Sequence, residues 1–171
     1  MEFSTATIVG QLRRTLEGMD GWIDKVHAHA TAKRYDADLL LQVRLAPDMF
    51  PLVRQYGSAC DSAKLCAARL SGRPVPSHAD DQKTWADVRH RVRDVVTILG
   101  GFGDADFANA AATKVVFPWN PGKGIQGREY LLQYVIPNFH FHASMAYAIL
   151  RHNGVELGKA DFLGPLPFHD V

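Results

Sequence analysis

Apolar residues recur with the 3.6-residue period of an α-helix in four segments of the chain. These segments cover approximately residues 5–30, 48–70, 81–99 and 128–152. Asp48 is a favourable N-cap for the second segment, and the third begins near Asp81 or Thr84. Gly-Gly after the third segment and Asn-Gly after the fourth are helix-stop signals. The pattern predicts an all-α protein built as an antiparallel four-helix bundle.

The segments between and after the helices predict less regular structure. The connections from the first to the second helix and from the third to the fourth are long for a minimal bundle. They either cover a site at one end of the bundle or cross over it. Residues 114–117 are compatible with a short β-ribbon strand, because Pro118 and Pro121 exclude a long one. We expect the C-terminal tail to pack across the bundle through its apolar residues Phe162, Leu163, Leu166 and Phe168.

Composition and charge limit the function classes. The 171 residues are 47% hydrophobic and 22% charged, which is typical of a globular chain, and we expect residues 1–171 to form one domain. The net charge of +1 disfavours a nucleic-acid partner. No signal peptide and no apolar run of about 18 residues is visible, so we expect a cytoplasmic protein without a membrane partner. On the third helix, water-facing positions are predicted for Arg89, His90, Arg91 and Arg93.

Two familiar motif types carry no chemistry here. Cys60 and Cys66 lie about 9 Å apart on a helix, beyond disulfide reach, so we expect reduced packing residues. Gly122, Gly124 and Gly127 match the pattern G-x-G-x-x-G, but no βαβ unit surrounds them. We interpret this glycine-rich stretch as a flexible loop.

The fourth helix carries the candidate site in the stretch N-F-H-F-H-A-S-M-A-Y, residues 138–147. His140 and His142 point to different faces, so they cannot share one metal ion on an unbroken helix. His142 falls on the apolar stripe, with Asn138 one turn before it. His140 falls on the more polar side, together with Tyr147.

Polar groups on an apolar stripe need partners, because an unpaired buried group costs about 1–3 kcal/mol. Gln55, on the inward stripe of the second helix, is a suitable partner for Asn138 and His142. The three residues either satisfy one another as a packing feature or form a ligand or metal site. Pro137 weakens the helix directly beside them.

Three stretches resemble a known family: L-A-P-D-M-F-P at 45–51, P-N-F-H-F-H-A-S-M-A-Y-A-I-L-R-H-N-G-V at 137–155, and D-F-L-G at 161–164. They are similar to an uncharacterised bacterial domain-of-unknown-function family of the DinB-like (DinB/YfiT) superfamily. The resemblance implies a four-helix bundle, often dimeric. Many members bind zinc or nickel through one histidine on the second helix and an H-x-x-x-H pair on the fourth. Some are thiol-dependent transferases or isomerases.

On this resemblance, the metal positions fall at Gln55, Asn138 and His142, and two of the three are carboxamides. Carboxamides are poor zinc ligands, so we expect weak metal binding or none, with His142 as the sole imidazole ligand or a general acid/base. His140 and Tyr147 are outer candidates for ligand binding.

Two functions follow from this set of residues. The first is a small-molecule-binding protein or a degenerate metal-dependent enzyme, with a polar pocket between the second and fourth helices. Whether it is an enzyme stays open. The alternative is a non-catalytic, structural or stress-associated bundle protein in which the polar residues only specify packing. In both cases we expect a homodimer.

Overall fold

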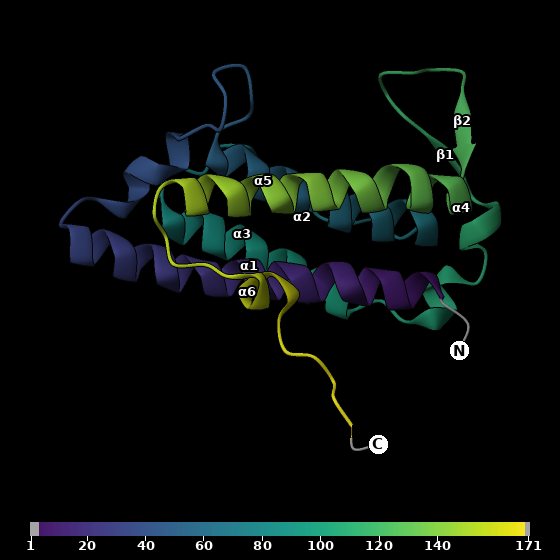
Figure 1. The fold of residues 1–171 in the computed structure, drawn as a ribbon. Helices are drawn as coiled ribbons and strands as arrows, with labels where there is room; N and C mark the ends of the chain where they lie inside the picture. Colours follow the sequence, from purple (N-terminus) through teal and green to yellow (C-terminus); the bar gives the residue numbers. More distant parts are fainter. Residues whose placement is uncertain (1–3, 170–171) are drawn as a thin grey trace.

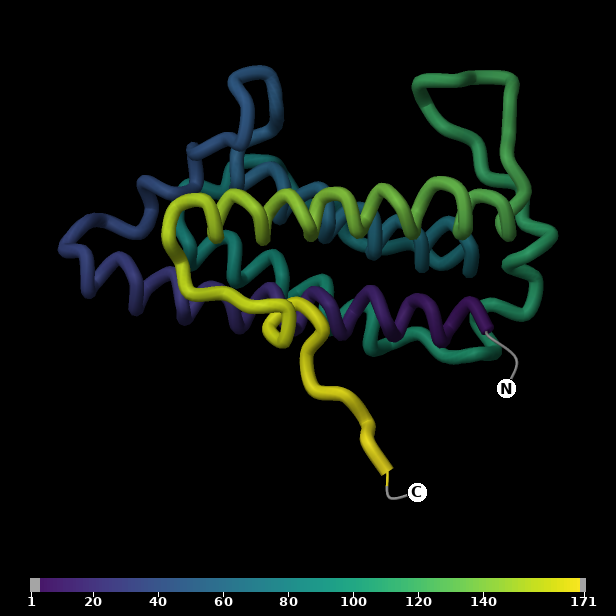
Figure 2. The backbone as a smooth tube through the Cα atoms, viewed as in Figure 1, coloured from purple at the N-terminus to yellow at the C-terminus, as the bar shows by residue number. Residues whose placement is uncertain are grey.

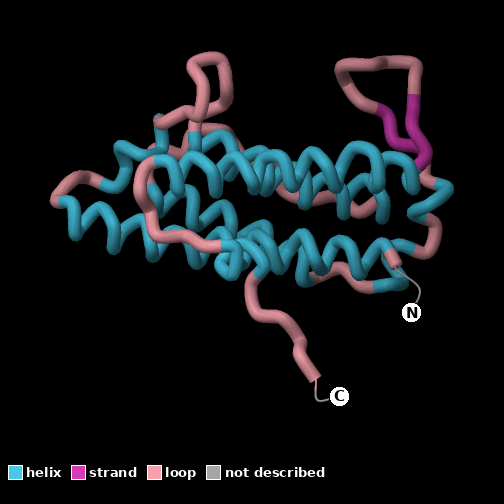
Figure 3. The backbone as a smooth tube through the Cα atoms, in the orientation of Figure 1, coloured by secondary structure: helices cyan, strands magenta, loops and turns pink. Residues whose placement is uncertain are grey.

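The computed structural model describes residues 4–169 and shows a bundle of four long helices (Figure 1). The long helices are α1 (Thr5–Lys33), α2 (Leu52–Ser71), α3 (Trp85–Gly100) and α5 (Ile136–His152). The short elements are α4 (Gly127–Glu129), α6 (Lys159–Leu163), and the antiparallel pair β1 (Lys114–Val116) and β2 (Gly124–Gln126), which Figure 3 sets apart in magenta. Short 3₁₀ turns cover Ala37–Gln42, Asp104–Phe107 and Ala110–Ala112. The predicted helical bundle and its short ribbon are confirmed.

The helices do not all alternate in direction. Antiparallel neighbours are α1 with α3 and α2 with α5. By contrast, Tyr56 near the start of α2 packs on Trp85 at the start of α3, and further along both helices Asp61 pairs with Arg91. The helices α2 and α3 are therefore parallel, and the connection 72–84 runs back along the bundle. The connection that crosses over the bundle is therefore the one between α2 and α3. The two longer connections, from α1 to α2 and from α3 to α4, do not cross over.

The starts of α2 and α3 have different causes. Thr84 caps α3, with its hydroxyl accepting from the Asp87 backbone N–H at 3.2 Å while the Asp87 carboxylate accepts from the Thr84 backbone. The prediction that Asp48 caps α2 is wrong: Asp48 is exposed, and α2 begins at Leu52 after Pro51. A residue that precedes proline disfavours helical dihedral angles, so the helix does not extend back through Phe50.

A π-helical segment, Tyr130–Val135, joins α4 to α5 in one continuous rod. Pro137 has no N–H, and in a regular α-helix its ring would clash with the carbonyl of Gln133. Wider turns before the proline accommodate this. In a regular α-helix, side chains four residues apart are rotated by about 40° about the helix axis. The wider π-helical turns offset this rotation. Tyr130, Tyr134, Asn138 and His142 consequently line the same cleft.

Two further predictions need correction. Arg91 does not face water: its side chain is 3% exposed, because Asp61 and Asp80 neutralise it inside the bundle. The glycine-rich stretch is not simply a loop, since Gly124 belongs to β2 and Gly127 begins α4. At Gly127 a Cβ atom would lie 1.8 Å from the carbonyl oxygen of Ala110, so only glycine fits.

The tail packs on the bundle only in part. Phe162 in α6 stacks on Trp22 of α1 with ring centroids 5.7 Å apart. Beyond α6 the chain turns at Gly164 and leaves the bundle, as Figure 2 shows. Leu163, Leu166 and Phe168 are exposed, contrary to prediction. Leu163 ends α6, and the prolines at 165 and 167 keep Leu166 and Phe168 in an extended segment away from the helices.

The core contains both cysteines. Cys60 and Cys66 are buried and free, and burial raises the pKa of each thiol to about 12. They are packing residues rather than reactive thiols. In the described part of the chain, no helix combines the length and hydrophobicity that crossing a membrane requires.

Candidate functional site

Gln55 of α2 and His142 of α5 contact each other, with His142 Nδ1 lying 2.8 Å from Gln55 Oε1. The Gln55 amide nitrogen donates to the Phe50 carbonyl at 3.1 Å, so the amide oxygen must face the imidazole. His142 therefore donates through Nδ1. Burial lowers the pKa of His142, which keeps the ring neutral at pH 7 and leaves a lone pair on Nε2.

Two more hydrogen bonds cross the same interface. Asn138 Nδ2 donates to Ser62 Oγ at 3.3 Å, and Arg69 Nη1 donates to Tyr130 Oη at 3.0 Å. The α2 residues of the three pairs, Gln55, Ser62 and Arg69, follow a seven-residue spacing, which places them on one face of the helix. The polar residues therefore form a seam along the α2–α5 interface.

A cleft of about 360 Å³ lies along this seam, within the size range of small-molecule sites. We call it the α2–α5 cleft. Its lining residues are Ser58, Asp61, Ser62, Leu65, Arg69, Phe117, Pro118, Trp119, Tyr130, Tyr134, Asn138 and His142. Figure 2 shows two loops rising from the same side of the bundle, one before α2 and one between β1 and β2. The first brings Phe50 parallel to the His142 ring, with centroids 6.4 Å apart, and the second supplies Phe117 to Trp119.

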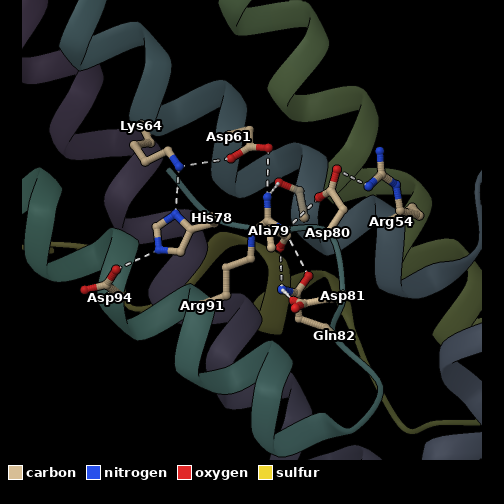
Figure 4. Close-up of polar contacts among 11 residues, drawn as sticks. Arg54, Asp61, Lys64, His78, Ala79, Asp80, Asp81, Gln82, Arg91 and Asp94 are labelled. Carbon is tan, nitrogen blue, oxygen red and sulfur yellow. Dashed lines mark hydrogen bonds and ion pairs between the residues drawn. The ribbon is translucent and has the colours of Figure 1, made fainter. Parts of the chain in front are cut away.

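Asp61 is the acidic residue among the side chains that line the cleft, and it is already paired (Figure 4). Arg91 Nη2 lies 2.8 Å from one of its oxygens, and Lys64 Nζ lies 3.3 Å from the other. Both cations are 3% exposed, so solvent screens these pairs weakly. Arg91 and Lys64, which lie behind the cleft, therefore neutralise the negative charge of Asp61. The Asp61 carboxylate is consequently a poor metal ligand or base.

The network behind Asp61 also fixes the crossover connection. In Figure 4, Arg91 reaches Ala79, Asp80 and Gln82 of this segment, with its Nη1 donating at 3.2, 2.9 and 2.9 Å. Lys64 donates to His78 Nδ1 at 2.7 Å, and His78 Nε2 then donates to Asp94 at 2.6 Å. These bonds hold residues 78–82 against α2 and α3.

The two outer candidates do not join this cleft. His140 lies in a different groove, between α1 and α5, beside Ile8 and Ile136. Tyr147 packs edge-on against Trp22, and its hydroxyl donates to the Leu157 carbonyl at 3.2 Å. The structure brings together Gln55, Asn138 and His142 and separates His140 and Tyr147 from them.

Sequence reasoning missed Ser62, Arg69, Asp61 and the tyrosines of the π-helical segment. Ser62 and Arg69 had a usable signal, because they continue the seven-residue spacing from Gln55. Tyr134 also had a signal, because it lies one turn before Asn138, whereas a regular helix would rotate Tyr130 by about 120° from His142.

Comparisons with known proteins identify the family and the fold of the chain. A family model described as "Domain of unknown function (DUF1993)" matches residues 5–163. The chain belongs to the DUF1993 family.

A crystal structure of a DinB family member protein from Shewanella denitrificans is similar to this DUF1993 chain. It has 45% sequence identity and a TM-score of 0.93, covering 95% of this chain and 93% of the other. The match confirms the DinB-like fold. No curated protein matches the chain.

The donor atoms of this DUF1993 site do not fit the three-histidine metal set that the superfamily resemblance implies. Gln55 uses its oxygen for His142 and its amide nitrogen for Phe50, so it has no free ligand atom directed at a metal. Asn138 offers a neutral carbonyl oxygen, a weak donor for zinc. Within residues 4–169, no three His, Cys, Asp or Glu side chains cluster closely enough to hold a metal ion.

Proposed function

We propose that this protein binds a small polar molecule in the α2–α5 cleft, with His142 Nε2 as the hydrogen-bond acceptor. The observation that carries the proposal is the Gln55 contact, which fixes the tautomer of a neutral imidazole that lines an open cleft. An oriented neutral imidazole accepts a hydrogen bond from a ligand hydroxyl, thiol or amine. It is also the group that acts as a general base near pH 7.

Neighbouring side chains support a binding role. Asn138 keeps its Oδ1 for a ligand, because its hydrogen bond to Ser62 uses the amide nitrogen. Ser58 and Ser62 add hydroxyl groups to the same cleft. A few polar groups between apolar walls are the usual composition of a small-molecule site. On this proposal, an enzymatic reaction would use His142 to take a proton from the bound molecule or from water.

The alternative function is a structural bundle protein in which the polar seam only fixes the register of α2 against α5. The observation in its favour is that each of the three cross-helix pairs is already hydrogen-bonded within the protein. Polar pairs at a helix interface can specify register in this way.

Histidine NMR distinguishes the two functions. Protein labelled with ¹⁵N-histidine is titrated at pH 7.5 with benzyl alcohol, phenol and benzamide, which are small donors of hydrogen bonds. We expect at least one probe to shift the Nε2 resonance of His142, while exposed His27 serves as the internal control. The proposal is wrong if no probe shifts His142, or if Gln55→Leu/His142→Leu protein binds the probes as tightly as the wild type.

Metal analysis tests the metalloenzyme version separately. Protein purified without a histidine tag and without added metal should contain far less than one zinc or nickel per chain. Near-stoichiometric metal that disappears in His142→Ala protein would instead support a metal-dependent enzyme.

A further inference from the structure

Arg69 lies at the opposite end of the α2–α5 cleft from His142 and is enclosed by aromatic rings. Its guanidinium carbon is 5.4 Å from the centroid of Phe117 and 5.7 Å from that of Tyr130. One nitrogen, Nη1, donates to the Tyr130 hydroxyl. The rings hold the guanidinium plane in place, and no buried unsatisfied atom belongs to it, so its remaining N–H groups reach the cleft or solvent.

Arg69 differs from the structural arginine nearby in its charge balance. Arg91 is held by two carboxylates, Asp61 and Asp80. Among the described residues, no carboxylate lies within ion-pair distance of Arg69, and the acid of the cleft, Asp61, is committed to Arg91 and Lys64. This end of the cleft therefore carries an uncompensated positive charge with a fixed, planar array of donors.

We infer that Arg69 binds the carboxylate or phosphate group of an aromatic small molecule. A guanidinium fork matches both anions with two parallel hydrogen bonds. The aromatic preference comes from Trp119, which stacks on Phe117 at 4.7 Å and is 69% exposed, so its outer face is open to a ligand ring. The inference rests on the proposed function, since it assigns a ligand class to the same cleft.

The length of the cleft adds a constraint on the ligand. The rod formed by the π-helical segment and α5 rises roughly 18 Å from Tyr130 to His142. A compact aromatic acid at Arg69 is therefore too short to reach His142, and only an elongated molecule contacts both ends of the cleft. The natural ligand on this inference is an elongated aromatic anion with a hydrogen-bond donor at its far end.

Fluorine NMR on 5-fluorotryptophan protein reports directly on this end of the cleft. The chain has three tryptophans. The resonance of Trp119 is assigned with Trp119→Phe protein, and buried Trp22 and Trp85 are internal controls for folding. The probes are benzoate and phenyl phosphate, with neutral benzamide and inorganic phosphate for comparison. Comparing the affinities of benzoate and phenyl phosphate shows whether the site prefers a carboxylate or a phosphate.

We expect benzoate or phenyl phosphate to shift Trp119 at a concentration at least about tenfold below that required for benzamide. Arg69→Gln should abolish this preference, and Arg69→Lys should weaken it because the fork is lost. Arg128→Gln removes an exposed charge outside the cleft and should change nothing.

The possible failures are distinguishable. If benzamide binds as well as benzoate and Arg69→Gln has no effect, the cleft is a binding site but the assignment of an anion to Arg69 is wrong. If no probe shifts His142, the proposed function itself is wrong, whether or not Trp119 responds.

Discussion

At the scale of single residues, the protonation state of His142 decides the chemistry of the cleft. Desolvation favours the neutral imidazole and lowers the pKa of His142. The unfolded chain has an ordinary histidine pKa of about 6.5. The contribution of this site to stability is therefore complete above about pH 6.5 and declines as the pH falls below that value. His140 shifts in the same direction because it is also partly buried.

A substitution at Gln55 should reverse this shift. Gln55→Glu places a carboxylate beside His142 and should raise the pKa of the imidazole above that in the wild type, since an adjacent negative charge favours the protonated ring. An NMR pH titration of the His142 ring measures this. The exposed His27 serves as the internal reference. An unchanged His142 pKa would contradict the contact between the two side chains.

Stability measurements should reveal the same pair. His142→Leu leaves the Oε1 atom of Gln55, a residue that is 1% exposed, without its partner and should destabilise the protein by about 1–3 kcal/mol. The double variant Gln55→Leu/His142→Leu should recover most of this loss, because no buried polar group stays unpaired. Urea unfolding of the four proteins of this cycle checks the coupling. Additive effects of the two substitutions would show that the pair is not coupled.

At the scale of elements, the helical periods in the sequence predicted the long helices because each has a continuous apolar stripe. They failed where a local interaction competes with the periodicity. Pro51 delays the start of α2 past Asp48, and Pro137 introduces π-helical turns that no apolar period reveals. The apolar stripes of the second and fourth predicted helices placed Gln55, Asn138 and His142 at a shared interface. It did not indicate Arg91, because an arginine becomes buried only when distant carboxylates meet it.

The start of α4 depends on a glycine. Gly127→Ala would place its Cβ 1.8 Å from the Ala110 carbonyl oxygen, so the backbone must move, and we expect a loss of about 1–3 kcal/mol. Gly21→Ala in α1 is the matched control, since a Cβ there meets nothing within 4 Å. That variant should be more stable than the wild type by up to about 1 kcal/mol. Thermal unfolding of both proteins tests the comparison, and equal effects would refute it.

At the scale of the whole molecule, buried charges hold the crossover connection in place. Arg91→Met removes the buried partner that Asp61 and Asp80 share, leaving them only Lys64 and Arg54, and should destabilise the protein by about 3 kcal/mol. Arg93→Met is the control, because Arg93 is 63% exposed and its ion pair should contribute less than about 1 kcal/mol. Hydrogen exchange should become faster in residues 78–82 of the Arg91 variant. Unchanged protection there would mean that other contacts hold the connection.

A homodimer stays a prediction at this scale. Leu132 and Phe141, on the rod that contains α5, are 49% and 50% exposed, and a second copy could cover such apolar side chains. Sedimentation velocity at micromolar concentration should show twice the mass of one chain. A single monomeric species would contradict the predicted homodimer.

The proposed binding role requires that Gln55 hold a neutral His142 in the tautomer that presents an unprotonated Nε2 to the α2–α5 cleft. A long-range ¹H–¹⁵N spectrum of histidine-labelled protein at pH 7.5 measures this tautomer directly. We expect a protonated Nδ1 and an unprotonated Nε2 for His142, with the preference reduced in Gln55→Leu protein. A protonated Nε2, or a fully charged ring at this pH, would contradict it.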